Sequence, residues 1–400
     1  MLLALRRCVR ALLLAVAVLS SSVSLAWADT EYFLVPAFST SKNDGQSGGI
    51  ILPVLVTDSE GELRDLIAPM FIQNSVVGAS GTVNWFSYGP SGERLEVIGT
   101  YTEKIERELS LTYEDPAFAQ GRFAVSFGAA FFKKATARFY GFSQDSRDQD
   151  ETNYTDREFG AYWEVGLYIN EVTQIAVSQR YRDVKVQRGA TDLAFTLDRF
   201  PGLDGGRDTS ILGHRLTFRY DTRTSLVTPT DGTELMLYAE LNQNLNKEEN
   251  AIYYRYQVEG KKLFPSPSKR AILVVRGNLQ ATFGEEVPFY ERSSLGGQNN
   301  LRGFGEDRFI DKQLLVFNVE QRFLVLRTQI FNVMADFEIA PFLDAGRVFN
   351  TFNDLQLFSN FEVTPGVGFR GLIRPNVVGR VDYGWSNEGG AVFAGLDYPF

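Results

Sequence analysis

The sequence predicts an all-β protein, a transmembrane antiparallel β-barrel of sixteen strands that occupies residues 47–400. Aromatic residues make up 13% of the chain, with 32 Phe and 17 Tyr, and 36 Gly accompany them. No uninterrupted run of apolar residues after residue 28 is long enough for a membrane-spanning helix. Instead, segments of about ten residues alternate apolar and polar positions between turn residues, which is typical of strands that cross an outer membrane.

The first 28 residues have the features of a secretory signal peptide. Arginines precede the apolar run 11–19, and Ala26-Trp27-Ala28 offers a cleavage site between small residues. We therefore expect residues 1–28 to be removed and residues 29–46 to form a short periplasmic segment before the barrel. Cys8 is the only cysteine, so its removal leaves a mature chain without disulfides.

The alternation has the chemistry of a barrel wall between lipid and water. In 252–263, for example, Tyr254, Tyr256 and Val258 share one face, while Arg255, Gln257 and Glu259 share the other. A soluble sandwich would also alternate, but here the polar face carries charges and glycines in many strands. A water-filled lumen explains the charges and glycines on the polar face, and the apolar face then contacts lipid.

Seventeen segments follow this pattern. Bacterial single-chain barrels have an even number of strands, so we expect one early segment to merge with its neighbour and leave sixteen. Short turns such as 170–173 and 265–267 lie on one side, and the longer loops 143–157, 187–210 and 283–312 lie on the other, which we assign as extracellular. The segments are 47–57, 62–74, 78–88, 93–103, 105–114, 120–132, 158–170, 174–186, 211–222, 233–243, 252–263, 270–282, 313–325, 335–349, 361–373, 377–386 and 391–400.

Several motifs together resemble the BamA superfamily of outer-membrane barrels, which includes TamA-like factors and two-partner secretion translocators. The resemblance is strongest after residue 210. Its motifs are Leu301-Arg302-Gly303-Phe304 in a glycine-rich loop, Phe342-Leu343-Asp344-Ala345-Gly346, a periplasmic turn with Asp221, Arg223, Pro229 and Gly232, and a C-terminal strand ending in Tyr398-Pro399-Phe400.

Luminal acidic residues give Arg302 partners if its loop folds into the lumen. Glu320 and Asp344 fall on the polar faces of their predicted strands, and two carboxylates suit the forked donors of one guanidinium. The resemblance implies the same pairing, with Gly303, Phe304 and Gly346 beside it. The alternative is a solvated loop arginine near unrelated acidic residues.

The resemblance also implies partners and a function. Members of the superfamily usually carry periplasmic POTRA domains that bind clients, and residues 29–46 are too few for one. We therefore expect a barrel that assists insertion or translocation of polypeptides or lipids, with a periplasmic partner or client polypeptide. Tyr398 and Phe400 resemble the signal that barrel-assembly machinery reads by strand addition. The alternative function is a passive channel or structural barrel.

The expected surroundings of the barrel are outer-membrane lipid and lipopolysaccharide. A formal net charge of −9 argues against nucleic acid as a partner.

Other interpretations of the sequence are less well supported. Gly45-Gln46-Ser47-Gly48-Gly49 matches a hydrolase motif but lacks the strand before it and the helix after it, and His214 lies on an apolar face, so we expect no enzyme. The acidic loop 143–158 lacks calcium-loop spacing, and we assign no metal or cofactor. Gly395 and Pro399 weakly favour a seam that opens beside the last strand.

Overall fold

The computed structural model describes residues 30–32, 34–41, 43–60, 62–246, 251–330, 333–352, 359–373 and 377–400. The predicted signal peptide, residues 1–28, lies outside them. Within the described ranges, no helix is both long and apolar enough to cross a membrane.

Strands account for most of the described chain, as the alternation predicts. They are β1 (Thr30–Tyr32), β2 (Val35–Ser41), β3 (Gly45–Ile51), β4 (Val54–Thr57), β5 (Leu63–Asn74), β6 (Gly78–Tyr88), β7 (Arg94–Thr102), β8 (Arg107–Ala117), β9 (Phe123–Phe139), β10 (Thr152–Asn170), β11 (Thr173–Arg188), β12 (Thr209–Asp221), β13 (Gly232–Asn244), β14 (Ile252–Pro265), β15 (Ala271–Phe283), β16 (Ser293–Leu295), β17 (Phe309–Asp311), β18 (Gln313–Ile330), β19 (Val333–Phe349), β20 (Glu362–Ile373), β21 (Val377–Ser386) and β22 (Gly389–Leu396). Among the described residues, four short helical turns lie between strands: α2 (Phe118–Gly121), η1 (Asp148–Asp150), α3 (Thr196–Arg199) and η2 (Phe289–Glu291).

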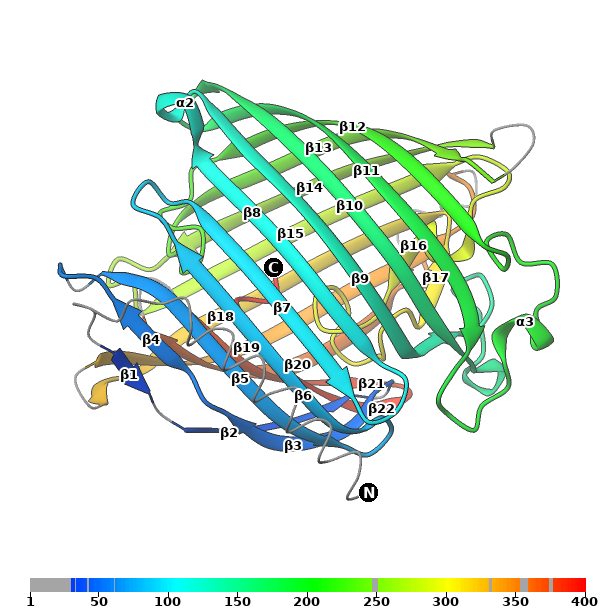
Figure 1. Cartoon of the computed structure of the whole chain (residues 1–400), viewed down its shortest axis with the longest axis horizontal. Helices are drawn as coiled ribbons and strands as arrows, with labels where there is room; N and C mark the ends of the chain where they lie inside the picture. Colours follow the sequence, from blue (N-terminus) through cyan, green and yellow to red (C-terminus); the bar gives the residue numbers. More distant parts are fainter. Residues whose placement is uncertain are drawn as a thin grey trace, which may run out of the picture.

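The strands form one antiparallel sheet that curls into a barrel (Figure 1). From β5 to β22, each strand pairs with its neighbours in sequence, except that β15 pairs with β18 because β16 and β17 form a separate hairpin. At the start, β3 and β4 both pair with β5, while β2 pairs with β3 and β1 with β4. Among the described residues, no ladder joins β2 to β22, so the sheet is not closed by hydrogen bonds.

The predicted count of sixteen is not confirmed, and the difference lies at the N-terminus. Every one of the seventeen predicted segments contains strand, and none leaves the sheet. The main sheet has 20 strands; counting β1 with β2 and β3 with β4 as single interrupted strands gives 18 positions. The segment 29–46, expected to lie outside the barrel, contributes β1 and β2. The even number is therefore reached by adding a strand, not by losing one.

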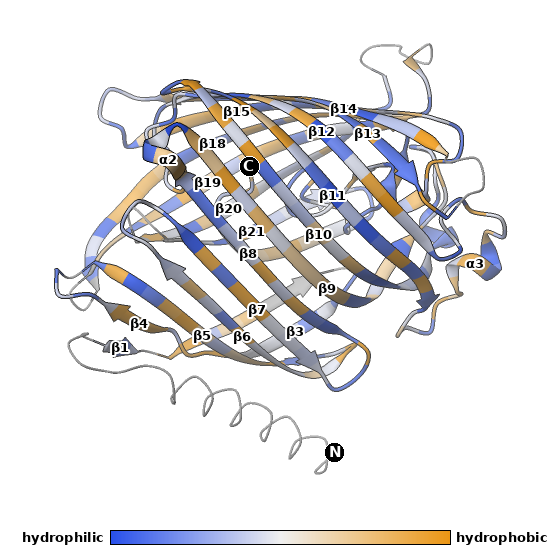
Figure 2. Cartoon of the chain, turned by 45° about the horizontal axis from the view of Figure 1, so that its top comes forward, coloured by the Kyte–Doolittle hydropathy of each residue, from blue (hydrophilic) through white to orange (hydrophobic). Residues whose placement is uncertain are grey.

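The two faces of the wall differ in chemistry, as Figure 2 shows by the alternation of hydrophobic and hydrophilic residues along the strands. On β14, Tyr254, Tyr256 and Val258 are exposed on the outer face. On β18, Asn318, Glu320 and Arg322 are buried within the lumen, while Phe317, Val319 and Phe323 are exposed outside. Polar side chains therefore occupy the interior, where they contact one another instead of lipid.

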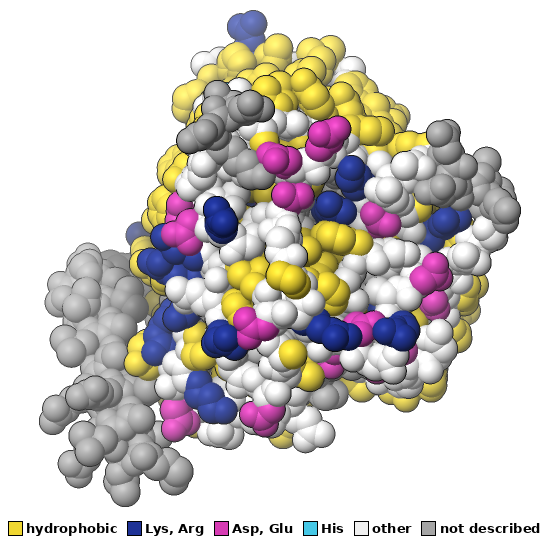
Figure 3. All heavy atoms as spheres, turned by 90° about the vertical axis from the view of Figure 1, so that its right-hand side faces the viewer, with side chains coloured by type: hydrophobic (Ala, Val, Ile, Leu, Met, Phe, Trp, Pro, Cys, Tyr) yellow, Lys and Arg dark blue, Asp and Glu magenta, His cyan; other side chains and the backbone are white. Residues whose placement is uncertain are grey.

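The end of the barrel that carries the long loops is covered. Figure 3 views this end and shows side chains of both charges across it, with hydrophobic side chains around the rim. Residues 284–312, here called the inward loop, connect the adjacent strands β15 and β18 and contain η2, β16 and β17. The hairpin of β16 and β17 lies within the barrel in Figure 1.

Candidate functional site

The tip of the inward loop is shaped by glycines. Gly296 and Gly297 have φ values of 125° and 91°, in the left-handed region where side chains are strained. A Cβ on Gly296 would lie 2.2 Å from the carbonyl oxygen of Gly305, so the two arms of the tip approach too closely for any other residue. This fold directs Arg302 toward the wall.

Arg302 lies fully buried between three luminal carboxylates. Its Nε and Nη2 donate to the two carboxylate oxygens of Asp344 at 2.8 and 2.9 Å, and its backbone N–H donates to the same group at 3.1 Å. Nη1 donates to Glu320 at 2.7 Å and lies 3.5 Å from Asp382. The guanidinium also stacks 3.4 Å over the ring of Phe342. The structure thus brings together Arg302, Glu320 and Asp344.

Further arginines complete a buried network on the wall. Glu320 accepts from Arg322 and Arg370, each at 2.9 Å. Asp382 pairs with Arg370 at 2.8 Å and with Arg380 at 2.7 Å. Burial alone would lower the pKa of Arg302, but the carboxylates of Asp344, Glu320 and Asp382 raise it above its ordinary value, so the guanidinium stays charged.

Small residues let the tip pack directly against the wall. A Cβ on Gly303 would lie 2.6 Å from Cγ2 of Thr364, and one on Gly384 would lie 1.3 Å from the carbonyl oxygen of Arg302. Gly346 makes similar room for Leu295 of the loop, 2.6 Å from the position of its absent Cβ. Backbone therefore touches backbone where the tip meets β21.

Phe304 has a packing role beside the arginine. It is fully buried, and its ring lies edge-on to Phe309 with centroids 5.1 Å apart. The surrounding apolar cluster joins the loop to β18 and β19, and consists of Leu295, Leu301, Phe304, Phe309, Leu314, Val316 and Val348.

The turn motif predicted to be periplasmic lies between β12 and β13, at the opposite end of the barrel from the long loops. Arg223 donates from its backbone N–H and from its Nε and Nη2 to Asp221, at 2.7 to 3.1 Å. Gly232 has a φ of 113°, and a Cβ there would lie 2.4 Å from the carbonyl oxygen of Thr222. Pro229 is buried within the turn. These contacts close a compact turn that is separate from Arg302.

The C-terminal residues depart from the prediction. The last strand ends at Leu396, short of the predicted end at residue 400, and Tyr398 and Phe400 turn into the lumen. The Tyr398 hydroxyl donates to Glu338 at 3.0 Å, and Phe400 packs against the cluster of Leu263, Ile272 and Val274.

Local backbone chemistry explains this departure. Asp397 has a φ of 66°, outside strand geometry, and Pro399 has no N–H to donate to a ladder. Phe400 is therefore not part of the last strand, in contrast to the predicted segment 391–400. Its role as an assembly signal stays a prediction.

Sequence reasoning missed Glu291, a second buried contact of the inward loop. Glu291 ends η2 and is 1% exposed. Its carboxylate accepts from Arg180 at 3.0 and 2.6 Å, from Arg255 at 2.6 Å and from Arg182. The alternation placed Arg255 on a luminal face, but nothing in the sequence showed which loop residue would reach it.

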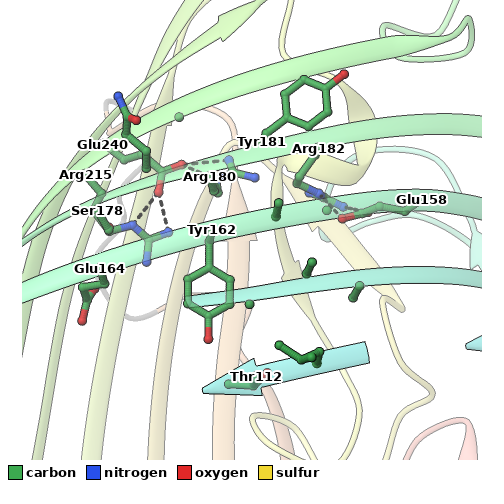
Figure 4. Close-up of a pocket in the computed structure, with 18 residues that line it drawn as sticks. Thr112, Glu158, Tyr162, Glu164, Ser178, Arg180, Tyr181, Arg182, Arg215 and Glu240 are labelled. Carbon is green, nitrogen blue, oxygen red and sulfur yellow. Dashed lines mark hydrogen bonds and ion pairs between the residues drawn. The ribbon is translucent and has the colours of Figure 1, made fainter. Parts of the chain in front are cut away.

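Arg180 and Arg182, two of the arginines around Glu291, border a luminal cavity of about 380 Å³ along β8 to β13 (Figure 4). Glu240 accepts from Arg180 at 3.0 Å and from Arg215 at 2.5 Å, and Glu158 accepts from Arg182 at 2.7 Å. The cavity wall is therefore charged, with each of these groups held by an opposite charge.

The residues considered for enzyme or metal chemistry lie apart. Ser47 is in β3, where its hydroxyl accepts from Asn74 at 2.8 Å. His214 lies on the outer side of β12, with its Nδ1 2.9 Å from Nε2 of Gln179. In the described part of the chain, no group of three or more His, Cys, Asp or Glu side chains is arranged to hold a metal ion.

Comparisons with known proteins agree on the family and fold. The model of the Omp85 superfamily domain matches residues 89–387. BamA from Haemophilus ducreyi, solved without POTRA domains 1–3, has a similar structure with a TM-score of 0.54 at 15% identity, over 91% of this chain and 74% of that one.

Two CdiB structures are also similar, each at 11% identity. CdiB from Escherichia coli gives a TM-score of 0.55 over 91% of this chain, and CdiB from Acinetobacter baumannii gives 0.51 over 92%. The chain spans 66% and 65% of their lengths, respectively. No curated protein sequence matches. The family match confirms the resemblance to the BamA superfamily: the chain belongs to the Omp85 superfamily and is a β-barrel protein of the bacterial outer membrane.

Proposed function

We propose that this barrel assists the insertion or translocation of polypeptides at the outer membrane, with the inward loop closing its lumen until a client engages. The observation that carries the proposal is the buried contact of Arg302 with Asp344 and Glu320. A passive pore needs an open lumen, and a loop held by desolvated ion pairs obstructs one. A loop held at discrete points also provides a closed state that a client or partner displaces.

The sheet edges add a second route by which a client strand engages the barrel. Strands β2 and β22 are the two ends of the described ladder, and each leaves backbone groups without a ladder partner. Such an edge accepts another strand by β-augmentation. We therefore assign the seam between β2 and β22 as the place where a client strand pairs or leaves sideways.

Client capture requires a binding surface in the periplasm. Members of the superfamily usually carry POTRA domains for this task, and we propose that a periplasmic partner takes part in client capture by this barrel. Lipopolysaccharide and outer-membrane lipid surround the barrel on this proposal, and the barrel-assembly machinery inserts it.

Site-specific photo-crosslinking in intact outer membranes tests the function. A crosslinker at Ser178 lines the luminal cavity, whereas one at the adjacent Val177 points outward and serves as the matched control. We expect polypeptide adducts at Ser178 that are absent at Val177. Identification of the trapped polypeptides then gives the client.

Planar-bilayer conductance separates the proposal from the alternative of a passive channel. The proposed function predicts small, short-lived openings in the unmodified protein, because the inward loop obstructs the lumen. Large steady openings, together with no luminal adducts, would support the passive channel instead.

A further inference from the structure

Glu291 occupies a site whose charge pattern is the reverse of the Arg302 site. The Arg302 guanidinium of the loop lies among carboxylates of β18, β19 and β21, whereas the Glu291 carboxylate lies among guanidinium groups of β11 and β14. The inward loop thus presents an anion to one sector of the wall and a cation to another.

Packing of the neighbouring Phe289 directs Glu291 toward the wall. Within η2, Phe289 is 1% exposed, and its ring lies edge-on to Phe139 and Tyr154 with centroids 5.1 and 5.2 Å away. These partners belong to β9 and β10 near their extracellular ends. Because Phe289 is inserted among them, Glu291 two residues later is directed toward Arg180 and Arg255.

The ion pairs of Glu291 stabilise its ionised form. Burial alone would raise the pKa of Glu291, but Arg180, Arg182 and Arg255 lower it well below its ordinary value. Every arginine in this contact comes from the wall, and the carboxylate comes from the loop. Its loss would leave guanidinium groups of like charge facing one another around Glu240 and Glu158.

We propose that Glu291 is a second anchor of the inward loop, and that the loop leaves the lumen in two steps because each anchor holds a different segment. Arg302 holds the tip, residues 296–304, against β18 to β21. Glu291 holds the first arm, residues 285–292, against β11 and β14. The two-anchor arrangement concerns the loop itself and holds whatever substrate crosses the membrane.

Hydrogen exchange measured separately on the two segments tests this proposal in the purified full-length barrel. Glu291→Gln keeps the side-chain volume and removes the charge. We expect it to raise exchange in 285–292 at least tenfold and to leave 296–304 unchanged. Arg302→Ala should do the reverse, and the double variant should release both segments and give a larger bilayer conductance than either single variant.

Glu164→Gln is the matched control, because Glu164 is a luminal carboxylate that pairs with Arg219 of the wall and not with the loop. The proposal is overturned if Glu291→Gln leaves 285–292 within twofold of the unmodified protein, if Glu164→Gln has the same effect, or if Arg302→Ala alone releases both segments. If Glu291→Gln does not give a heat-modifiable barrel, Glu291→Asp provides the same readouts, since the shorter side chain withdraws the carboxylate from the arginines.

Discussion

Replacing Arg302 with alanine should free the tip of the inward loop, and the structure predicts which carboxylate suffers most. Asp344 loses both hydrogen bonds from the guanidinium. Of the charged and amide side-chain donors described around it, the Asn318 amide remains, at 2.8 Å. Glu320 retains ion pairs with two arginines, and Asp382 also retains two. The substitution therefore leaves Asp344 as a poorly compensated buried charge.

The expected magnitude follows from this burial. Breaking a buried ion pair by removing one partner costs about 3–5 kcal/mol, because the remaining charge stays desolvated. Since about 1.4 kcal/mol corresponds to a factor of ten, local opening of the tip should become roughly a hundredfold to several thousandfold more frequent. Arg302→Lys should be nearly as damaging, because an ammonium group cannot bond both oxygens of Asp344 and also reach Glu320.

Hydrogen exchange of residues 296–304 measures this opening directly. A double-mutant cycle then compares partners: coupling of Arg302 to Asp344 should exceed its coupling to Glu320, because Glu320 retains other cations. Arg219→Ala is the control, since Arg219 pairs with Glu164 and does not touch the loop. Unchanged exchange in Arg302→Ala, or a coupling to Glu320 as large as that to Asp344, would refute the reasoning.

Three further predictions test the packing, the C-terminus and the pH dependence. Gly384→Ala should displace the tip and raise its protease sensitivity, because the added Cβ would lie 1.3 Å from the Arg302 carbonyl oxygen, whereas Gly379→Ala on the same strand meets only an ordinary 3.8 Å contact and should be silent. Phe400→Ser should lower the heat-modifiable fraction in outer membranes by removing luminal packing and the presumed assembly signal; unchanged levels under strong expression would contradict this. The pKa of Glu291 in the folded protein lies below its ordinary value, so its ion pairs are fully present above the ordinary pKa and are lost only as the pH falls through the folded pKa. Hydrogen exchange in 285–292, corrected for its intrinsic rate, should therefore be the same at about pH 8 and about pH 6. It should rise only in stronger acid.

The strands were predictable because each side chain in the wall of a membrane barrel faces either the lipid or the lumen. That choice gives each strand a period of two, and the segments 78–88 and 377–386 even have the observed bounds of β6 and β21. The strand formed by β1 and β2 was missed although its even positions Tyr32, Leu34 and Phe38 are exposed on one face. Pro36 interrupts that alternation.

The site was only partly predictable, for a geometric reason. Period two places Asp382 and Arg370 in the lumen, but their contacts with Arg302 depend on how far adjacent strands are displaced along one another. Sequence alternation carries no information about that displacement. The motifs supplied Arg302 and Asp344, and the alternation placed Glu320 on a luminal face. The position of Glu291 instead depends on the insertion of Phe289 among aromatics from distant strands.

When the inward loop leaves, the two anchors leave different charges behind on the barrel wall. Among the described residues, the ion pairs of the cluster around Glu291 involve four arginines, Arg180, Arg182, Arg215 and Arg255, and, besides Glu291, two wall carboxylates, Glu158 and Glu240. The wall around Arg302 instead has three carboxylates and three arginines of its own: Glu320, Asp344, Asp382, Arg322, Arg370 and Arg380. When the loop leaves, the first sector keeps an excess of positive charge and the second is balanced. Because like charges in a partly desolvated lumen repel, departure of Glu291 costs more within the wall itself, which favours release of the Arg302 tip as the earlier of the two steps.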